Sequence, residues 1–386
     1  MHLTQDVNKL LDVRGLNIQT HSQTLVHDLS FELKKGQTLA IVGESGSGKS
    51  ISSLALLGLL PSNLQVSGQA ILQQQNLLQL APAQLRFIRG QKIAMIFQEP
   101  MTALNPLHRV EKLIGESLRL QGLSKSKTRE RVIALLQDVG IPQPKDKLRR
   151  YPHELSGGQR QRVMIAMALA QDPEILIADE PTTALDVTLQ VQILELLKTL
   201  QQQRNMAMIL ISHDLNLVRR YANQVIVMQH GHVVEQGLVQ DVFAQPKHAY
   251  TQNLLNHDFG QALHVPAQEV LLDLQQVAVK FPIKQGLLNR VKDYVVAVEP
   301  LDLQLQQGRS LGIVGESGSG KSSLALAIAR LIPSTGKIVL LGQDLNAYSE
   351  KQLRPIRRDL QIVFQDPSSS LKPRFSIEQI PAEGWQ

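Results

Sequence analysis

The first two thirds of the chain alternate short apolar runs with longer amphipathic stretches. Glu174–Asp179 and Met206–Ser212 are short and largely apolar, as is typical of parallel strands that are buried on both faces. Val187–Gln203 lies between them and carries apolar residues at helical spacing. Leu29–Leu33 and Thr38–Val42 are two further predicted strands. The order strand, helix, strand predicts an α/β fold with a parallel core.

Other segments depart from this alternation. The pattern of Thr102–Tyr151 is helical, and Ser124–Val139 within it is amphipathic, which predicts an inserted helical subdomain. Val225–Met228 and His232–Glu235 flank a short polar turn and predict an antiparallel hairpin. Gly237–Gln268 is mixed and polar, and we interpret its later part as a linker.

The chain contains the ten residues IVGESGSGKS twice, at Ile41–Ser50 and at Ile313–Ser322. Two strand-like runs, Val270–Val279 and Val296–Leu305, precede the second copy, and LQIVFQDP at Leu360–Pro367 echoes an earlier KIAMIFQEP. A repeat of this kind indicates two related domains. We expect a complete domain at residues 1–260, a linker at 261–270 and the first part of a second domain at 271–386.

The second domain is expected to be incomplete. It shows no counterpart of Leu155–Gln159, Glu174–Glu180 or His213. We therefore expect its sheet to lack strands, which would leave apolar faces and a strand edge uncovered and make the domain poorly stable.

Composition narrows the class of protein only slightly. The 386 residues are 43% hydrophobic and carry a net charge of +6, which permits ordinary globular cores and an acidic partner without requiring one. Cysteine is absent, so disulfides, thiolate metal sites and iron–sulfur clusters are excluded. The first residues lack a secretory pattern, and no apolar run approaches the ~18 residues that span a bilayer. We expect a chain that is soluble or held at a membrane by other subunits.

The repeated loop is suited to hold a polyphosphate. A predicted strand precedes it and the apolar helix Ser50–Leu60 follows, which is the context of a phosphate-binding loop. Its glycines let backbone amides point inward at a helix N-terminus, where anions are favoured. Lys49 supplies a positive charge to the β- and γ-phosphates, and the Ser50 hydroxyl can ligate Mg²⁺. The predicted nucleotide-binding residues are Gly43, Glu44, Ser45, Gly46, Ser47, Gly48, Lys49 and Ser50, and in the second loop Gly315, Glu316, Ser317, Gly318, Ser319, Gly320, Lys321 and Ser322.

Two adjacent acids end one of the predicted strands. Asp179 is placed to hold Mg²⁺ through water, and Glu180 to take a proton from an attacking water. Two acids at such a place can also simply cap a helix. The phosphate-binding loop upstream favours the catalytic interpretation.

A second anion site is predicted at Leu155–Gln159, whose sequence LSGGQ directly precedes a long helix. It lies on a separate subdomain and is not expected to serve the phosphates that Lys49 binds. Two such sites on one domain suggest that each nucleotide is shared between two bodies. The residues predicted to contact the shared nucleotide are Ser156, Gly157, Gly158 and Gln159.

LSGGQ, followed by ILIADEP and by SHD at Ser212–Asp214, resembles the ATP-binding-cassette ATPase family. The resemblance covers Leu11–Leu255 and, in part, Leu271–Trp385. It implies a P-loop NTPase core of the RecA-like type, with an antiparallel β subdomain and an inserted helical subdomain. It also implies ATP and Mg²⁺ as ligands and hydrolysis of ATP as the activity.

The resemblance assigns roles to matching residues. Gln98 resembles the loop glutamine that touches Mg²⁺ and the attacking water, and His213 resembles the histidine that bonds the γ-phosphate. A lone histidine would otherwise be more often structural. Asp186 resembles the aspartate that links two composite sites. In the second domain the corresponding metal-contacting residues would be Ser322 and Gln365.

One position departs from the family pattern. Family members usually place an aromatic ring near the end of the first strand to stack on adenine, whereas Thr20 occupies that place in this chain. We therefore expect weaker ATP binding by the first domain. In the second domain Phe281 could serve as the stacking ring, with core packing as the alternative.

Lys92–His108 and Pro246–Leu255 resemble segments of oligopeptide and dipeptide uptake ATPases, and the double-cassette layout resembles the ATPase of Yej-type peptide and microcin C importers. This implies a peripheral subunit at the cytoplasmic face of the inner membrane. Its implied partners are permease subunits that work with a periplasmic or extracytoplasmic solute-binding protein, and no nucleic acid.

The expected active form is a homodimer or a pair with a second cassette subunit, because no composite site is complete within one chain. One alternative is a truncated, catalytically silent ATP-binding protein. Another is a soluble cassette protein that acts on ribosomes or DNA. The latter should carry a long charged linker or a coiled coil, and Gly237–Gln268 is neither.

Overall fold

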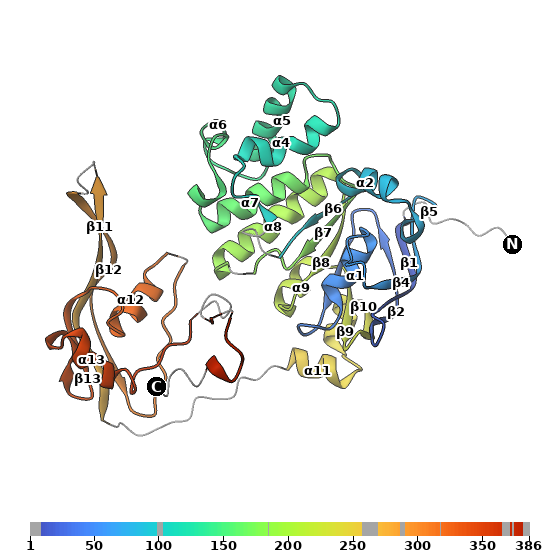
Figure 1. Cartoon of the computed structure of the whole chain (residues 1–386). Helices are drawn as coiled ribbons and strands as arrows, with labels where there is room; N and C mark the ends of the chain where they lie inside the picture. Colours follow the sequence, from blue (N-terminus) through green and yellow to red (C-terminus); the bar gives the residue numbers. More distant parts are fainter. Residues whose placement is uncertain are drawn as a thin grey trace. The chain divides into compact units, whose positions relative to one another are not determined.

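The computed structural model describes residues 9–98, 103–183, 185–256, 269–285, 290–316, 318–364, 371–372 and 374–380. The chain divides into two compact units, Met1–Gly260 and Gln261–Gln386, which we call the first and the second unit (Figure 1). Within the described ranges, every helix is too short or too polar to cross a lipid bilayer.

The first unit is built on a ten-stranded sheet with the strand order β5-β4-β1-β2-β10-β9-β3-β8-β7-β6. Its parallel strands are β3 (Thr38–Val42), β6 (Ile93–Ile96), β7 (Ile175–Asp179), β8 (Ala207–Ile211) and β9 (Gln224–Gln229). Every residue of β3, β6, β7 and β8 is buried, because helices or other strands cover both faces of this half. The predicted α/β fold with a parallel core is confirmed.

Antiparallel strands extend the sheet on the side of β9. They are β1 (Lys9–Gln19), β2 (Thr24–Lys34), β4 (Gln65–Leu72), β5 (Gln75–Asn76) and β10 (His232–Leu238). The pairing of β10 with β9 confirms the predicted hairpin. A single parallel pairing, between His232 and His27, connects β10 to β2 and so joins the antiparallel subdomain to the core.

Helices cover the sheet and fill the connections of the first unit. They are α1 (Lys49–Leu56), α2 (Pro82–Gln91), α4 (Val110–Leu120), α5 (Lys125–Asp138), α6 (Pro144–Lys147), α7 (Gly157–Ala168), α8 (Val187–Arg204), α9 (Leu215–Tyr221), α10 (Val239–Ala244) and α11 (Ala249–Leu255). Short 3₁₀ turns occur at Leu77–Gln79 and Pro152–Glu154.

Two sequence-based predictions need correction at this level. The helix predicted at Ser50–Leu60 ends at Leu56, because Gly58 turns the chain with a left-handed φ of 58°. The segment Gly237–Gln268, which looked mixed and polar, contains α10 and α11. Residues 257–268 lie outside the described ranges.

Alternate residues of the central strands face two different cores. In β7, Ile175 and Ile177 belong to the apolar cluster that also contains residues of α1, β1 and β2. Leu176 and Ala178 belong to the cluster formed with α7 and α8. Because successive side chains of a strand point to opposite faces, α1 and α7 cover opposite faces of the sheet.

The predicted helical subdomain is formed by α4, α5 and α6, which gather beside α7 (Figure 1). The predicted amphipathic helix at Ser124–Val139 is confirmed as α5, and its N-cap Ser124 accepts a hydrogen bond from the Lys127 backbone N–H at 3.4 Å. Val132 and Leu135 of α5 are fully buried in the cluster that also holds α7. The outer helices thus fix α7 in place.

The described part of the second unit contains a four-stranded sheet with the order β12-β11-β13-β14, together with helices. Its elements are β11 (Val270–Gln285), β12 (Arg290–Gln306), α12 (Lys321–Ile328), β13 (Thr335–Leu340), β14 (Gln343–Asp344), a 3₁₀ turn (Leu345–Ala347) and α13 (Glu350–Ile356). The predicted strands Val270–Val279 and Val296–Leu305 are confirmed within the longer hairpin of β11 and β12.

The repeated loop sequence has different surroundings in the two units. Ile41 and Val42 are 1% and 0% exposed, because β3 pairs with β8 and β9. Ile313 and Val314, in the same sequence, are 43% and 92% exposed and form no strand. Among the described residues of the second unit, no strand pairs with residues 311–314, so their apolar side chains stay uncovered.

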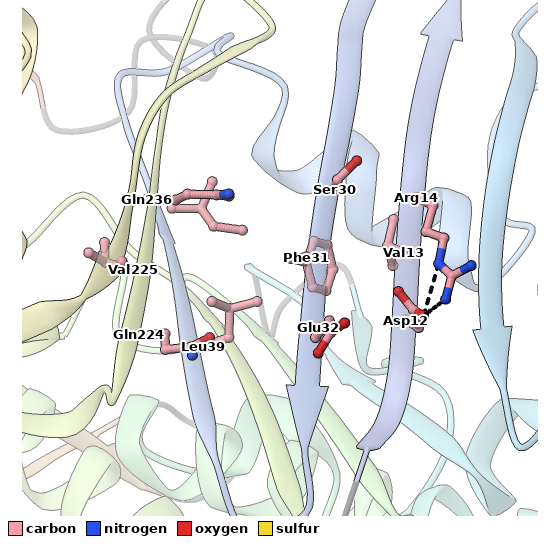
Figure 2. A pocket seen from close by; sticks show the side chains of 12 residues that line it. Asp12, Val13, Arg14, Ser30, Phe31, Glu32, Leu39, Gln224, Val225 and Gln236 are labelled. Carbon is pink, nitrogen blue, oxygen red and sulfur yellow. Dashed lines mark hydrogen bonds and ion pairs between the residues drawn. The ribbon is translucent and has the colours of Figure 1, made fainter. Parts of the chain in front are cut away.

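A pocket of about 550 Å³ lies where β1 and β2 meet β3, β9 and β10 (Figure 2). At its edge Asp12, which is 6% exposed, accepts hydrogen bonds from Lys9 at 3.0 Å and from Arg14 at 2.6 Å. Burial opposes the charge of Asp12, but these two cations outweigh burial and lower the pKa of the carboxyl below its usual range. None of the predicted site residues lines this pocket, and its charges satisfy one another. We interpret it as structural.

Candidate active site

The first repeated loop connects β3 to α1 and lies close against β9. Gly43 has a φ of 147°, and a Cβ atom there would stand 2.1 Å from the carbonyl oxygen of Met228. Gly48 is the N-cap of α1 with a φ of 99°, and no side chain caps the helix. The first backbone amides of α1 are therefore available to an anion.

The Lys49 side chain closes the loop. Its Nζ donates hydrogen bonds to the carbonyl oxygens of Gly43 at 2.7 Å and of Glu44 at 2.6 Å, and the residue is 6% exposed. Burial lowers the pKa of Lys49, although the carboxylates of Glu180, Asp179 and Glu44 oppose this shift. The ammonium group is thus held inside the curl of the loop.

Ser50 and Asp179 are hydrogen-bonded. The Ser50 hydroxyl donates to Oδ1 of Asp179 at 2.9 Å, which links the start of α1 to the end of β7. Burial raises the pKa of Asp179, and the neighbouring Glu180 carboxylate adds to the rise, while Ser50 and Lys49 act against it. The buried carboxylate of Asp179 and the hydroxyl of Ser50 together offer hard oxygen ligands to a cation.

Polar groups from its own turn and from two other segments surround the carboxylate of Glu180. Its Oε2 accepts hydrogen bonds from the Gln98 amide at 3.0 Å and from the Thr183 hydroxyl at 2.9 Å. His213 Nδ1 lies 3.4 Å from Oε1. The side chains of His213 and Glu180 are 67% and 17% exposed, so the carboxylate is sheltered but reachable by water.

The backbone explains why these groups meet. Gln98, Glu180 and His213 each follow one of three adjacent parallel strands, β6, β7 and β8, and the carboxyl ends of parallel strands share one edge. Glu180 also has a left-handed φ of 44°, and its N–H donates to the Ile211 carbonyl at 3.0 Å. Such a backbone costs about 1–3 kcal/mol and is concentrated at functional sites.

LSGGQ lies elsewhere in the first unit. Ser156 is the N-cap of α7, where its Oγ accepts a hydrogen bond from the Gln159 N–H at 3.3 Å and Gln159 Oε1 accepts one from the Ser156 N–H at 3.4 Å. A Cβ at Gly158 would meet the Leu189 side chain of α8 at 3.2 Å. Among the described residues, no hydrogen bond joins residues 156–159 to the first loop, in keeping with the position of α7 and α1 on opposite sheet faces.

Asp186 comes after the turn that follows Asp179 and Glu180. It is the N-cap of α8, and its Oδ1 accepts a hydrogen bond from the Leu189 N–H at 3.0 Å. This bond ties Asp186 to α8, the helix whose Leu189 side chain lies against Gly158.

The second loop repeats the curl of the first. Lys321 Nζ donates to the carbonyl oxygens of Gly315 at 2.8 Å and of Glu316 at 2.6 Å. Gly318 and Gly320 have left-handed φ angles of 84° and 90°. Its Ser322 is exposed and, within the described ranges, has no carboxylate partner of the kind that Asp179 provides to Ser50. Ser317 and Gln365 lie outside the described residues.

The residues at the predicted adenine-stacking positions, Thr20 and Phe281, differ between the two units. Thr20 forms the turn between β1 and β2, and its hydroxyl oxygen accepts hydrogen bonds from the N–H groups of Ser22 at 3.2 Å and Gln23 at 2.9 Å. This side chain is occupied in shaping the turn and has no ring to stack. Phe281 on β11 is 42% exposed, so the core-packing alternative for it is wrong.

Sequence reasoning missed two residues of this site. Thr183 donates a hydrogen bond to Glu180. The sequence signal for it was a hydroxyl residue three positions after the acid, in the turn that follows β7. Tyr250 of α11 accepts a hydrogen bond from the Glu44 N–H at 2.9 Å, across 206 positions of the sequence. Nearby, residues of the first loop, α9 and α11 line a cavity of about 600 Å³.

The comparisons with known proteins agree on one family. The family model described as ABC transporter matches residues 26–183 and again residues 298–385. The chain is 50% identical over 384 residues to the peptidoglycan transport ATP-binding protein YejF of Agrobacterium fabrum, covering 97% of this chain and 70% of that protein. It is 44% identical over 414 residues to the glutathione import ATP-binding protein GsiA of Salmonella typhimurium, covering 96% and 66%.

Solved structures give the same result. The structure of cbiO1 from Clostridium perfringens, part of the ABC transporter complex cbiONQ, matches with a TM-score of 0.55 and 29% identity, covering 62% of this chain and 92% of that one. The ATP-binding cassette MJ0796, in a dimeric post-hydrolysis state with ADP and phosphate, matches with a TM-score of 0.53 and 26% identity, covering 60% and 99%. With the phosphate-binding loop, the acids at the end of β7 and these similarities in place, the chain belongs to the ABC transporter family of ATP-binding proteins, which bind nucleotide and hydrolyse ATP.

Proposed function

We propose that the chain is the ATP-hydrolysing subunit that energises an importer of peptides or peptide-like solutes. The observation that carries this proposal is the Glu180 carboxylate, held by Gln98, Thr183 and His213 beside the Ser50–Asp179 pair. The solute class is supported by the names of the relatives, which concern peptidoglycan and glutathione. Peptidoglycan carries peptide stems, and glutathione is a tripeptide.

In the proposed reaction, a water oxygen attacks the γ-phosphorus of ATP and the bond to the β–γ bridging oxygen breaks, giving ADP and phosphate. Glu180 accepts the proton of the attacking water. Gln98 and Thr183 keep the Glu180 carboxylate oriented through their hydrogen bonds to Oε2. Lys49 balances the charge of the β- and γ-phosphates, and the exposed His213 bonds the γ-phosphate.

Three residues, from the start of α1, the end of β7 and the segment after β6, suit Mg²⁺. Ser50, Asp179 and Gln98 offer hydroxyl, carboxylate and amide oxygens, which are the hard ligands that this ion prefers. The described part of the chain holds no cluster of three or more His, Cys, Asp or Glu side chains able to form a metal cage. Mg²⁺ typically binds through one or two protein ligands together with substrate phosphates, whose charge it neutralises.

Replacing Asp179 by Asn is expected to raise the Mg²⁺ concentration for half-maximal ATPase activity about tenfold, the effect of one unit charge acting through an intervening water. Asn keeps an acceptor for the Ser50 hydroxyl, so the local hydrogen bond survives. Mg²⁺ titration of steady-state turnover measures the change. Asp172→Asn is the matched control, because Asp172 pairs with Arg131 away from the site. An unchanged Mg²⁺ requirement in Asp179→Asn would contradict the metal assignment.

The partners follow from the separation of the two anion sites. We propose that the nucleotide on the first loop is completed by Ser156–Gln159 of another cassette, either a second copy of this chain or a different cassette subunit. Residues 1–260 act as a complete cassette in this proposal, residues 261–270 as a linker, and residues 271–386 as the first part of a second cassette. Permease subunits and an extracytoplasmic solute-binding protein complete the importer, with this chain at the cytoplasmic face of the membrane.

Reconstitution tests the proposed function directly. Proteoliposomes are made with permease subunits in the membrane, this chain and ATP inside, and the solute-binding protein outside. They are expected to accumulate a labelled oligopeptide. The same vesicles made with a Glu180→Gln chain serve as the control and are expected to accumulate little. Equal uptake with the two chains would refute the proposed coupling of hydrolysis to transport.

Replacing Thr20 by Tyr is expected to tighten ATP binding about tenfold. A base–aromatic stack contributes about 1–3 kcal/mol, whereas losing the turn hydrogen bonds of Thr20 costs about 1 kcal/mol. Thr20→Ala separates the two effects, since it loses the turn bonds without adding a ring. Calorimetric titration with ATP measures both variants, and equal affinities for them would mean that adenine does not stack at this position.

A further inference from the structure

Pro246–Leu255 (PKHAYTQNLL), which resembles a segment of peptide uptake ATPases, has no role in the reaction described above. It forms the entry to α11 and α11 itself. Glu235 of β10 fixes its start, because its carboxylate accepts hydrogen bonds from the N–H groups of Lys247 at 2.9 Å and His248 at 3.1 Å. His248 then caps α11 by accepting the Tyr250 N–H at 3.2 Å. The segment is thus anchored tightly just before Tyr250.

The Tyr250 side chain runs from α11 into the core of the first unit. It is 7% exposed and packs in the cluster that contains Ala40 and Val42 of β3, the strand that leads into the first loop. Its hydroxyl oxygen accepts a hydrogen bond from the Glu44 N–H at 2.9 Å. Burial raises the pKa of the Tyr250 hydroxyl, so the group stays a neutral phenol.

The bonded N–H belongs to the peptide unit that joins Gly43 to Glu44. The carbonyl oxygen of that same unit is Gly43 O, which accepts a hydrogen bond from Lys49 Nζ at 2.7 Å. The peptide unit is planar, with N–H and C=O pointing in opposite directions. The Gly43–Glu44 peptide unit is therefore hydrogen-bonded to Lys49 through its carbonyl and to Tyr250 through its N–H.

We propose that Tyr250 is a positioning residue of the nucleotide site, which holds the Gly43–Glu44 peptide so that its carbonyl keeps Lys49 aimed at the phosphates. The proposal rests on the function proposed for the first loop. The proposal also couples the nucleotide site to α11, the last described helix before the second unit. A shift of α11 would reach Lys49 through one hydrogen bond and one rigid peptide plane.

The loop of the second unit indicates how large the effect of losing the Tyr250 hydrogen bond should be. Its loop curls with Lys321 at 2.8 Å from Gly315 O, and Glu316 has no tyrosine partner among the described residues. The curl therefore forms without such a bond. Tyr250 restrains the peptide rather than creating the loop, so its removal should weaken nucleotide binding without abolishing it.

The test compares Tyr250→Phe with Tyr221→Phe in the 386-residue chain. Tyr221 is also 7% exposed, and its hydroxyl bonds Glu195 at 2.9 Å, away from the first loop. Tyr250→Phe is expected to raise the Kd and KM for ATP about three- to tenfold with kcat within twofold, the cost of one hydrogen bond made equally in ground and transition states. Tyr221→Phe should leave both constants within twofold. Equal affinity losses in the two variants, or an unchanged Kd in Tyr250→Phe, would overturn the proposal.

Hydrogen exchange provides a readout that does not depend on nucleotide. In the chain without ATP, the Glu44 amide is expected to exchange at least tenfold faster in Tyr250→Phe than in the parent, and at the parental rate in Tyr221→Phe. An unchanged rate at this amide would show that Tyr250 does not hold the peptide. A parent that binds no ATP, but whose Glu44 amide responds as expected, would instead refute the function proposed for the loop.

Discussion

Replacing Glu180 by Gln is expected to lower steady-state ATP turnover by about 10²–10⁴-fold, the range of general acid–base contributions. Gln has nearly the same shape as Glu, and its amide oxygen can still accept the hydrogen bonds that Gln98 and Thr183 now donate. The left-handed backbone at this residue, with its φ of 44°, is equally accessible to both residues. The variant therefore keeps the geometry of the site and loses only a group that can take a proton.

The same change should leave ATP bound. The phosphate contacts proposed for Lys49 and the first loop do not involve Glu180, so binding should persist while hydrolysis stops. A filter-binding or size-exclusion measurement with labelled ATP is expected to recover unhydrolysed ATP on the variant. Turnover is measured by phosphate release.

Glu195→Gln is the matched control for this experiment. Glu195 is a carboxylate of the same unit that accepts hydrogen bonds from Arg220 and from Tyr221, outside the site. Its replacement should leave turnover within twofold. If Glu180→Gln turned over ATP within threefold of the parent, another group would have to be the base.

The parallel core could be predicted from the sequence because its signal is local. Strands such as β7 are short runs of apolar residues, and their burial on both faces leaves little choice of element. Gln98 and His213 were assigned from the family resemblance, and the structure shows why they meet Glu180: each of the three residues follows one of the neighbouring parallel strands β6, β7 and β8.

Other features depend on contacts that the local sequence does not contain. Ile41–Val42 and Ile313–Val314 are the same dipeptide, yet the first is buried in β3 and the second is exposed. Burial at these positions is decided by sheet partners far away in the chain. The bond between Tyr250 and Glu44 spans 206 positions and likewise has no local signature. Sequence patterns predict elements well, whereas such long-range contacts need the folded chain.

The second large effect is expected at the LSGGQ helix. Ser156→Asp should reduce turnover about a thousandfold, because a carboxylate about 4 Å from a phosphate costs about 4 kcal/mol at an effective dielectric constant near 20. Aspartate is as good an N-cap as serine, so α7 should keep its start. Ser124→Asp makes the same change at the N-cap of α5 and should leave turnover within twofold. Normal turnover in Ser156→Asp would show that LSGGQ does not contact the phosphates of the nucleotide.

Mixing two inactive variants identifies the body that supplies this helix. Lys49→Ala spoils the loop of its own cassette and keeps LSGGQ, whereas Ser156→Asp keeps the loop and spoils LSGGQ. If two copies of this chain pair symmetrically, random mixing makes half of the dimers mixed. Each mixed dimer holds one intact site of two, so about a quarter of the parental turnover should return. Turnover that stays at the level of the separate variants would exclude a second copy as the partner and leave a different cassette subunit to complete the site.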